Sequence, residues 1–128
     1  MSRILLVLAG GGVGSVLRYL TTLAAVRLLS PNFPFGTLIV NLVGCFFIGF
    51  VHTLALLTAR VSPETRLFLT TGVIGGLTTY SSFNYEALAL VDQERAVSAG
   101  VYVAVMLVGC AVVGLFGTFS ARALVASG

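Results

Sequence analysis

Long apolar segments follow one another along almost the whole chain, separated by short polar connectors. Each of the four segments reaches the roughly 20 residues that a helix needs to cross the hydrocarbon core of a bilayer. They lie at about residues 4–28, 35–59, 67–90 and 97–125. Pro31 and Pro34 mark the first connector, and Ser62 before Pro63 is typical of the start of a helix. The pattern predicts an all-α integral membrane protein with four transmembrane helices in a single domain, residues 1–128.

The composition agrees with this pattern and excludes an ordinary soluble domain. Hydrophobic residues make up 58% of the chain and charged residues only 9%, with a mean hydropathy of +1.09. Soluble domains carry about a quarter charged residues. The first segment is longer than the apolar part of a signal peptide and lacks a small-residue cleavage pattern, so we expect it to be retained as a span.

The third segment is unusual because glycines and hydroxyl residues interrupt its apolar pattern. Its centre reads Gly72-Val-Ile-Gly-Gly-Leu-Thr-Thr-Tyr-Ser-Ser-Phe83. Glycine permits a break in the helix, and Thr and Ser hydroxyls can bond the backbone groups that the break releases. Such a break is tolerated at membrane depth only where the backbone is buried in protein or lines a cavity. We therefore predict a broken third helix, with the break near residues 75–79, beside a path or binding site.

The basic residues give the chain little preference for one orientation in the membrane. One side of the predicted four-helix arrangement carries Arg3, Arg60, Arg66 and Arg122. The other side carries Arg27 and Arg95. Orientation follows the difference in basic residues near the span ends, and this difference is small. A chain that inserts both ways up can form an antiparallel dual-topology homodimer. Because four short spans alone enclose little volume, a path through the protein would also need a second subunit.

Polar residues within the spans are candidates for function because each is costly in lipid unless it is paired. Arg18 lies near the middle of the first segment and Glu86 in the second half of the third. Two interpretations stay open for them. Arg18 and Glu86 form a charge pair that holds helices together, or Arg18 stands at a vestibule and attracts anions.

Asn41 and the residues after the predicted break are candidates for binding a small anion. The Asn41 amide offers donors that can replace water around an anion, although a helix–helix hydrogen bond is the simpler role. Thr79 and Tyr80 each lie about one helical turn before Phe83, and Ser81 adds a further hydroxyl. Aromatic ring edges carry partial positive charge, so they can line an anion path without a full charge that would trap the ion. Plain packing is the ordinary alternative for these rings.

The sequence offers no support for an enzyme. Residues 10–14 read GGGVG but open no βαβ unit, and no nucleophile–base constellation follows. His52 has no second ligand at helical spacing, so we interpret it as a packed histidine. Cys45 and Cys110 lie in apolar segments, and two such isolated thiols indicate neither a disulfide nor a metal pair.

Three blocks, taken in order, resemble the signature sequences of the Fluc (CrcB) family of bacterial fluoride channels. They are Gly10-Gly-Gly-Val-Gly14 with Arg18-Tyr19, Gly36-Thr-Leu-Ile-Val-Asn41-Leu-Val-Gly44, and the stretch from Gly72 to Phe83 followed by Glu86. The match covers three of the four segments. In the fourth, Cys110, Gly114 and Thr118 form only a compatible stripe at one-turn intervals.

The resemblance implies an antiparallel homodimer with two fluoride pores, each lined by both subunits, and a central structural sodium ion. Asn41, Tyr80 and Phe83 match residues that line the pore, and backbone carbonyls at Gly75 and Thr78 match those that coordinate sodium. Four carbonyls, two from each subunit, suit a hard cation. The family ordinarily has phenylalanine at the position of Tyr80, so a phenol here adds a hydroxyl to the path.

The resemblance further implies passive export of fluoride across the inner, plasma membrane, with Asn41, Thr79 or Ser81 supplying donors to the ion. Two other interpretations stay open. A small proton-coupled exporter of the multidrug-resistance type also has four short spans, but it needs a central acid, and only Glu86 is available. A structural subunit without transport explains the glycines and leaves Asn41 and residues 78–83 without a purpose.

Overall fold

The computed structural model describes residues 2–127, and every regular element within that range is a helix. The two end residues of the predicted domain lie outside the described range. The helices are α1 (Arg3–Leu28), α2 (Phe35–Leu57), α3 (Pro63–Leu67), the π-helix η1 (Phe68–Ile74), α4 (Gly75–Leu77), α5 (Tyr80–Asp92) and α6 (Ala96–Ala126).

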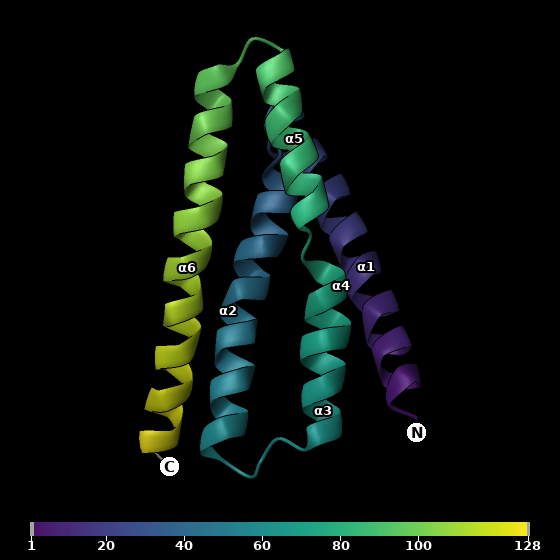
Figure 1. The fold of residues 1–128 in the computed structure, drawn as a ribbon, viewed down its shortest axis with the longest axis vertical. Helices are drawn as coiled ribbons and strands as arrows, with labels where there is room; N and C mark the ends of the chain where they lie inside the picture. The colour runs from purple at the N-terminus through teal and green to yellow at the C-terminus, as the bar shows by residue number, and fades with distance from the viewer. Residues whose placement is uncertain (1, 128) are drawn as a thin grey trace.

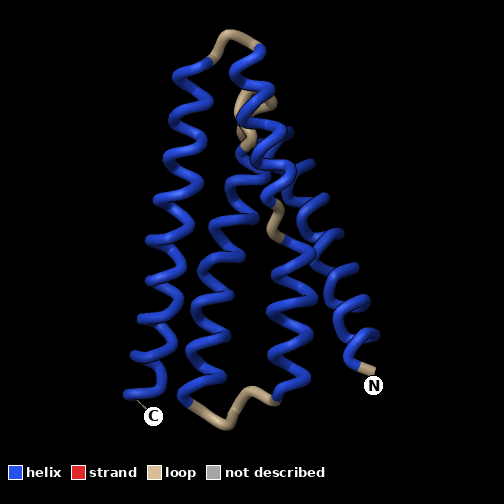
Figure 2. Tube along the Cα trace, in the orientation of Figure 1, coloured by secondary structure: helices blue, strands red, loops and turns tan. Residues whose placement is uncertain are grey.

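The helices make four passes along the long axis of the molecule, and both ends of the chain lie at the same end of it (Figure 1). Three helices, α1, α2 and α6, are each long and apolar enough to cross a membrane. The remaining pass is shared by α3, η1, α4 and α5, which follow one another in line (Figures 1 and 2). The prediction of an all-helical multi-pass membrane protein is therefore confirmed.

The third pass is interrupted at two residues, within the range that the sequence predicts. Thr78 and Thr79 are extended, with φ and ψ of −81° and 153° and of −154° and 118°. The tube view shows the gap as a short loop between α4 and α5 (Figure 2). The sequence did not predict that the helix is already irregular before this point, where η1 has the wider turns of a π-helix. Such turns are often found at functional sites.

Glycines let α1 lie directly against the lower half of the third pass. A Cβ at Gly10 would lie 2.7 Å from the carbonyl oxygen of Phe68, and a Cβ at Gly14 would overlap the carbonyl oxygen of Val73. A Cβ at Gly76 would in turn overlap the carbonyl oxygen of Gly11. Lipid gives helices no hydrophobic reason to associate, so this close van der Waals contact holds the two passes together.

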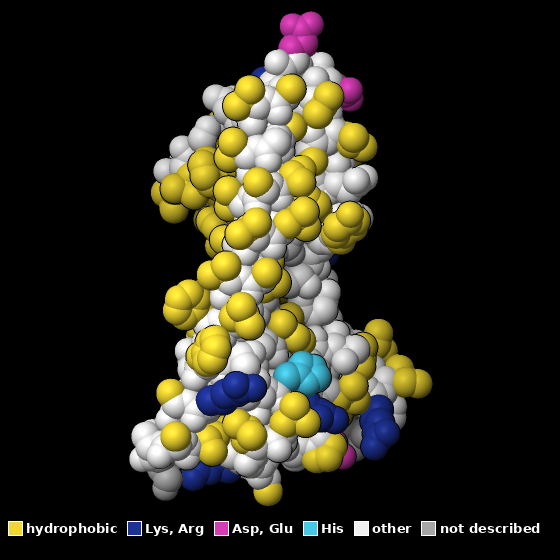
Figure 3. All heavy atoms as spheres, turned by 60° about the vertical axis from the view of Figure 1, so that its left-hand side comes forward, with side chains coloured by type: hydrophobic (Ala, Val, Ile, Leu, Met, Phe, Trp, Pro, Cys, Tyr) yellow, Lys and Arg dark blue, Asp and Glu magenta, His cyan; other side chains and the backbone are white. Residues whose placement is uncertain are grey.

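The second helix packs along α6 in the same way, and the remaining apolar surface faces outward. A Cβ at Gly117 would overlap the carbonyl oxygen of Phe46, and a Cβ at Gly49 would overlap that of Gly114. Figure 3 shows hydrophobic side chains spread over the length of the molecule, whereas arginines and the histidine gather toward its lower end. This distribution suits a protein surrounded by lipid, with its charges near the membrane surface.

Gly14→Ala is expected to destabilise the protein by about 1–3 kcal/mol, because the new methyl group has to displace backbone and not a movable side chain. Gly12→Ala is the matched control on the same helix, since a Cβ there meets no atom within 4 Å. The measurement is the unfolding midpoint of both variants in the same detergent. Equal midpoints for the two variants would contradict the close packing at Gly14.

Candidate functional site

The side chain of Asn41 binds both polar backbone groups of Thr79, the second residue of the break. Asn41 is 8% exposed, and its Oδ1 accepts a hydrogen bond from the backbone N–H of Thr79 at 2.8 Å. Its Nδ2 donates to the carbonyl oxygen of Thr79 at 3.1 Å. Backbone groups released inside a bilayer find no water to bond. The amide of Asn41 therefore supplies the partners that the interrupted helix lacks.

Thr79 also starts the second half of the third pass. Its Oγ1 accepts a hydrogen bond from the backbone N–H of Ser82 at 3.2 Å, which is the usual arrangement at a helix N-cap. The same oxygen donates to Oγ of Ser82 at 3.1 Å and lies 3.2 Å from Oγ of Ser81. Three hydroxyl groups thus gather at the first turn of α5, where the helix dipole favours negative charge.

Aromatic rings continue from this turn toward α6. The rings of Tyr80 and Phe83 lie 5.5 Å apart and those of Phe83 and Tyr102 lie 5.3 Å apart, both pairs edge to face. Phe83 is only 6% exposed, whereas Tyr80 is 75% exposed. The structure thus brings the two aromatic residues predicted from the sequence together, but it leaves most of the Tyr80 ring uncovered by its own chain.

Asn41, Tyr80 and Phe83 line an open pocket of about 380 Å³ between α2, the third pass and α6, whereas Thr79 and Ser81 do not line it. None of the described residues that line it carries a formal charge, and its polar groups are amide, hydroxyl, thiol and backbone. The lining includes Asn41, Gly75, Thr78, Tyr80 and Phe83 from the predicted set. An uncharged, donor-lined pocket can replace the water around a small anion without holding that anion tightly.

Glu86 lies beyond the aromatic rings and takes its hydrogen bonds from two hydroxyl groups. Thr37 Oγ1 donates to Oε1 of Glu86 at 2.8 Å, and the phenol of Tyr102 donates to Oε2 at 2.7 Å. These bonds join α2, α5 and α6. The carboxylate is therefore satisfied by hydroxyls and not by Arg18, which lies half-exposed on α1. This leaves the vestibule interpretation of Arg18 open.

Gly75 and Thr78, the two residues predicted to hold a cation through their backbone carbonyls, both line the pocket. In a continuous α-helix the N–H of Thr79 would bond to the carbonyl of Gly75, but here it donates to Asn41. The Gly75 carbonyl is thereby released from its usual partner, and Gly75 is exposed at the pocket. Carbonyl oxygens are suitable ligands for hard cations.

The stripe predicted on the fourth segment is divided in the structure. Cys110 lines the pocket, whereas Gly114 and Thr118 pack against α2, where a Cβ at Gly49 would overlap the Gly114 carbonyl and lie 3.1 Å from Thr118 Oγ1. Two other residues of α6 face the site: Met106, one turn before Cys110, lines the pocket, and Tyr102, two turns before it, packs against Phe83.

The sequence interpretation missed both of these residues. Tyr102 is fully buried, and Met106 Sδ accepts a hydrogen bond from Asn41 Nδ2 at 3.5 Å. A signal was present, since Tyr102, Met106 and Cys110 follow at intervals of four and Tyr102 is a polar aromatic in an apolar span.

Comparison with known proteins places the chain among membrane channels. Residues 5–118 match the family described as CrcB-like protein, Camphor Resistance (CrcB). A protein of Anaeromyxobacter sp. (strain K) is 49% identical over 95% of this chain and 97% of its own length. One from Rhizobium etli is 46% identical over 98% of this chain and 100% of its own length. One from Chlorobaculum tepidum is 51% identical over 85% and 86% of the two chains.

Each of these three relatives is named a fluoride-specific ion channel FluC. The resemblance stated from the sequence is thereby confirmed, and so is the expectation that the chain is not an enzyme. With a family match over most of its length and relatives close to half identical, the chain belongs to the CrcB-like protein family.

Proposed function

We propose that this protein is a fluoride-selective channel that lets cytoplasmic fluoride leave the cell down its electrochemical gradient. The observation that carries the proposal is the near-full-length identity of 46–51% to relatives named fluoride-specific ion channels. The structure supports it with an uncharged pocket in which a buried amide, hydroxyl groups and aromatic ring edges lie side by side.

These groups account for how a strongly hydrated anion could enter an apolar membrane. The Asn41 amide, which exchanges its long hydrogen bond to the Met106 sulfur for one to the ion, the hydroxyls of Thr79 and Ser81 and the ring edges of Tyr80 and Phe83 replace water around the ion in turn. Because none of them carries a full charge, the ion is bound weakly enough to leave again. A narrow path of this kind rejects chloride by its size. The Tyr80 phenol adds a hydrogen-bonding group where the family ordinarily has a bare ring.

The working form in this proposal is an antiparallel homodimer with two pores, each lined by both copies. Tyr80 is 75% exposed and the pocket is open on one side, so a single chain does not enclose a path. A second copy inserted the other way up supplies the missing wall. The small difference in basic residues between the two ends is compatible with insertion in both orientations.

A sodium ion at the two-fold axis fits the carbonyl oxygens that the break releases. Gly75 and Thr78 of each copy would hold it, and its role is to fix the broken helices of the two copies together. Exhaustive removal of sodium is therefore expected to weaken the dimer and to lower fluoride flux, with recovery on adding sodium but not potassium. The measurement is flux and dimer fraction in sodium-free and sodium-containing buffers; full activity without sodium would contradict a required ion.

The proposed location is the plasma membrane, the inner membrane in bacteria with two. Fluoride that enters a cell as the neutral acid dissociates in the cytoplasm and cannot diffuse back. The negative interior then drives the anion outward, because a unit charge gains about 2.3 kcal/mol per 100 mV. A channel needs no coupling ion for this task.

Fluoride efflux from liposomes that contain the purified protein tests the proposal. Vesicles loaded with potassium fluoride are treated with a potassium ionophore, and fluoride is read with a selective electrode, with matched potassium chloride vesicles as control. Fast fluoride loss without chloride loss is the expected result. Proton-driven efflux of an organic cation that disappears in Glu86→Gln would instead support the multidrug-resistance-type exporter and overturn the channel.

A further inference from the structure

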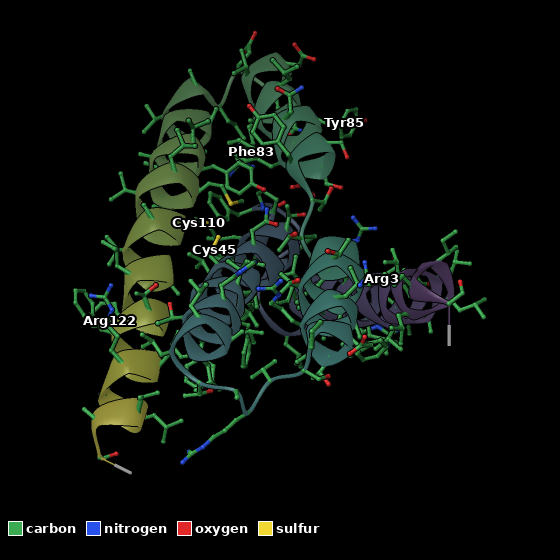
Figure 4. The ribbon with its side chains drawn as sticks, turned by 60° about the horizontal axis from the view of Figure 1, so that its bottom comes forward. Arg3, Cys45, Phe83, Tyr85, Cys110 and Arg122 are labelled. Atoms are coloured by element: carbon green, nitrogen blue, oxygen red, sulfur yellow. The ribbon has the colours of Figure 1, made fainter. Side chains whose placement is uncertain are left out.

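Three sulfur-containing side chains from two helices line one pocket. The Sγ of Cys110 lies 3.9 Å from the Sδ of Met106, one turn earlier on α6. Cys45 on α2 and Cys110 on α6 line the same pocket, and so does Met106. Figure 4 shows both cysteines in the space between α2 and α6, close to Phe83. Both are free thiols and only partly buried.

This group of donors selects for soft metal ions. Thiolate and thioether sulfur favour soft cations such as copper(I), whereas carboxylate and carbonyl oxygen favour hard ones. Among the described residues, no group of three His, Cys, Asp or Glu side chains is placed to hold a metal. Closed zinc sites are built from four such ligands, so these residues are too few for a closed zinc site. Two thiols and a thioether meet the lower coordination number of a monovalent d¹⁰ cation.

We propose that Cys45, Cys110 and Met106 form a binding site for a soft monovalent cation of the copper(I) or silver(I) class. In the binding step one thiol loses its proton to water, a sulfur–metal bond forms, and the second thiol and the thioether bind as neutral donors. One thiolate and one monovalent cation together carry no net charge. Neutrality matters because an uncompensated charge is costly at this depth in a membrane. The flexible Met106 side chain can adjust to the metal.

The site lies beside the proposed ion path. Met106 accepts a hydrogen bond from Asn41, and Phe83 lines the same pocket. A bound metal would draw Met106 away from Asn41 and fill part of the pocket, so it is expected to slow fluoride flux. The expected slowing of fluoride flux rests on the proposed function, whereas metal binding itself does not.

Silver ion is the probe, because it is soft, monovalent and stable to oxidation in air. The purified protein is equilibrated with silver nitrate in chloride-free detergent buffer with a competing thioether ligand, and bound metal is measured by mass spectrometry. About one silver ion per chain is expected, with release of protons. The double variant Cys45→Ser with Cys110→Ser is expected to bind none, and Met106→Leu to bind at least about tenfold more weakly.

His52→Ala is the matched control, since His52 is the only imidazole of the chain and lines a different pocket. It is expected to bind silver as the unchanged protein does. Binding retained in the double serine variant, or lost in His52→Ala, would overturn the site. So would a disulfide between Cys45 and Cys110, seen as a protein mass about 2 Da lower without bound metal. Silver binding without any fluoride flux would sustain the site and count against the proposed function.

Discussion

Replacing Asn41 with alanine is expected to reduce fluoride flux by at least about tenfold, which corresponds to a barrier raised by about 1.4 kcal/mol. The change removes the amide that would replace water around the ion. It also leaves the N–H and the carbonyl of Thr79 without their partners. An unsatisfied buried polar group costs about 1–3 kcal/mol, so the free energy of unfolding is expected to fall as well. The measurements are liposome efflux and the unfolding midpoint in detergent.

Asn84→Ala is the matched control for this experiment. Asn84 lies on α5 and is exposed, so its replacement deletes the same amide without disturbing the break. We expect Asn84→Ala to keep both flux and unfolding midpoint near those of the unchanged protein. Unaltered flux in Asn41→Ala would remove this residue from the ion path, whereas lower stability with unaltered flux would leave it only the structural role.

The outline of the fold was predictable because lipid imposes strong rules on a chain that crosses it. Span length, connectors and capping residues predict the four passes. The glycines and hydroxyl residues of the third segment predict a break near residues 75–79, and the structure places it at Thr78 and Thr79. The π-helix of Phe68–Ile74 was not predictable in the same way. Its wider turns change which residues face α1. An apolar sequence with one glycine does not distinguish π-helical turns from α-helical ones.

The candidate site was predicted in part. Residue type marked some of its members in the sequence, but their hydrogen-bond partners depend on the fold. An isolated Asn in an apolar helix indicates a polar role, so Asn41 was predicted as a site residue. The sequence did not predict that its amide bonds to the backbone of Thr79, 38 residues later. In the same way Glu86 was found and its partners were not. Tyr102 is fully buried and donates to Glu86, a contact that depends on how α5 and α6 pack.

Phe83→Leu is expected to lower fluoride flux by at least about tenfold. The free energy of unfolding is expected to fall by only about 0.5–1.5 kcal/mol for each of the two aromatic pairs that Phe83 forms. Leucine keeps much of the apolar volume, so the core around the site remains filled. It lacks the ring edge whose partial positive charge is proposed to meet the ion. Phe83 is 6% exposed and packs edge to face against both Tyr80 and Tyr102, so its ring is held in a fixed orientation at the pocket.

Phe116→Leu provides the comparison, because Phe116 lies on α6, is 63% exposed and lines none of the pockets described above. The same exchange of ring for aliphatic side chain is made there without touching the site, so wild-type flux is expected. Efflux from liposomes containing each variant at equal protein density gives the ratio. If Phe83→Leu conducts as fast as Phe116→Leu, the ring edge is not part of the path, and donors alone must replace the water around fluoride. A loss confined to Phe83→Leu, in protein that migrates like the unchanged protein, ties permeation to the aromatic edge rather than to packing.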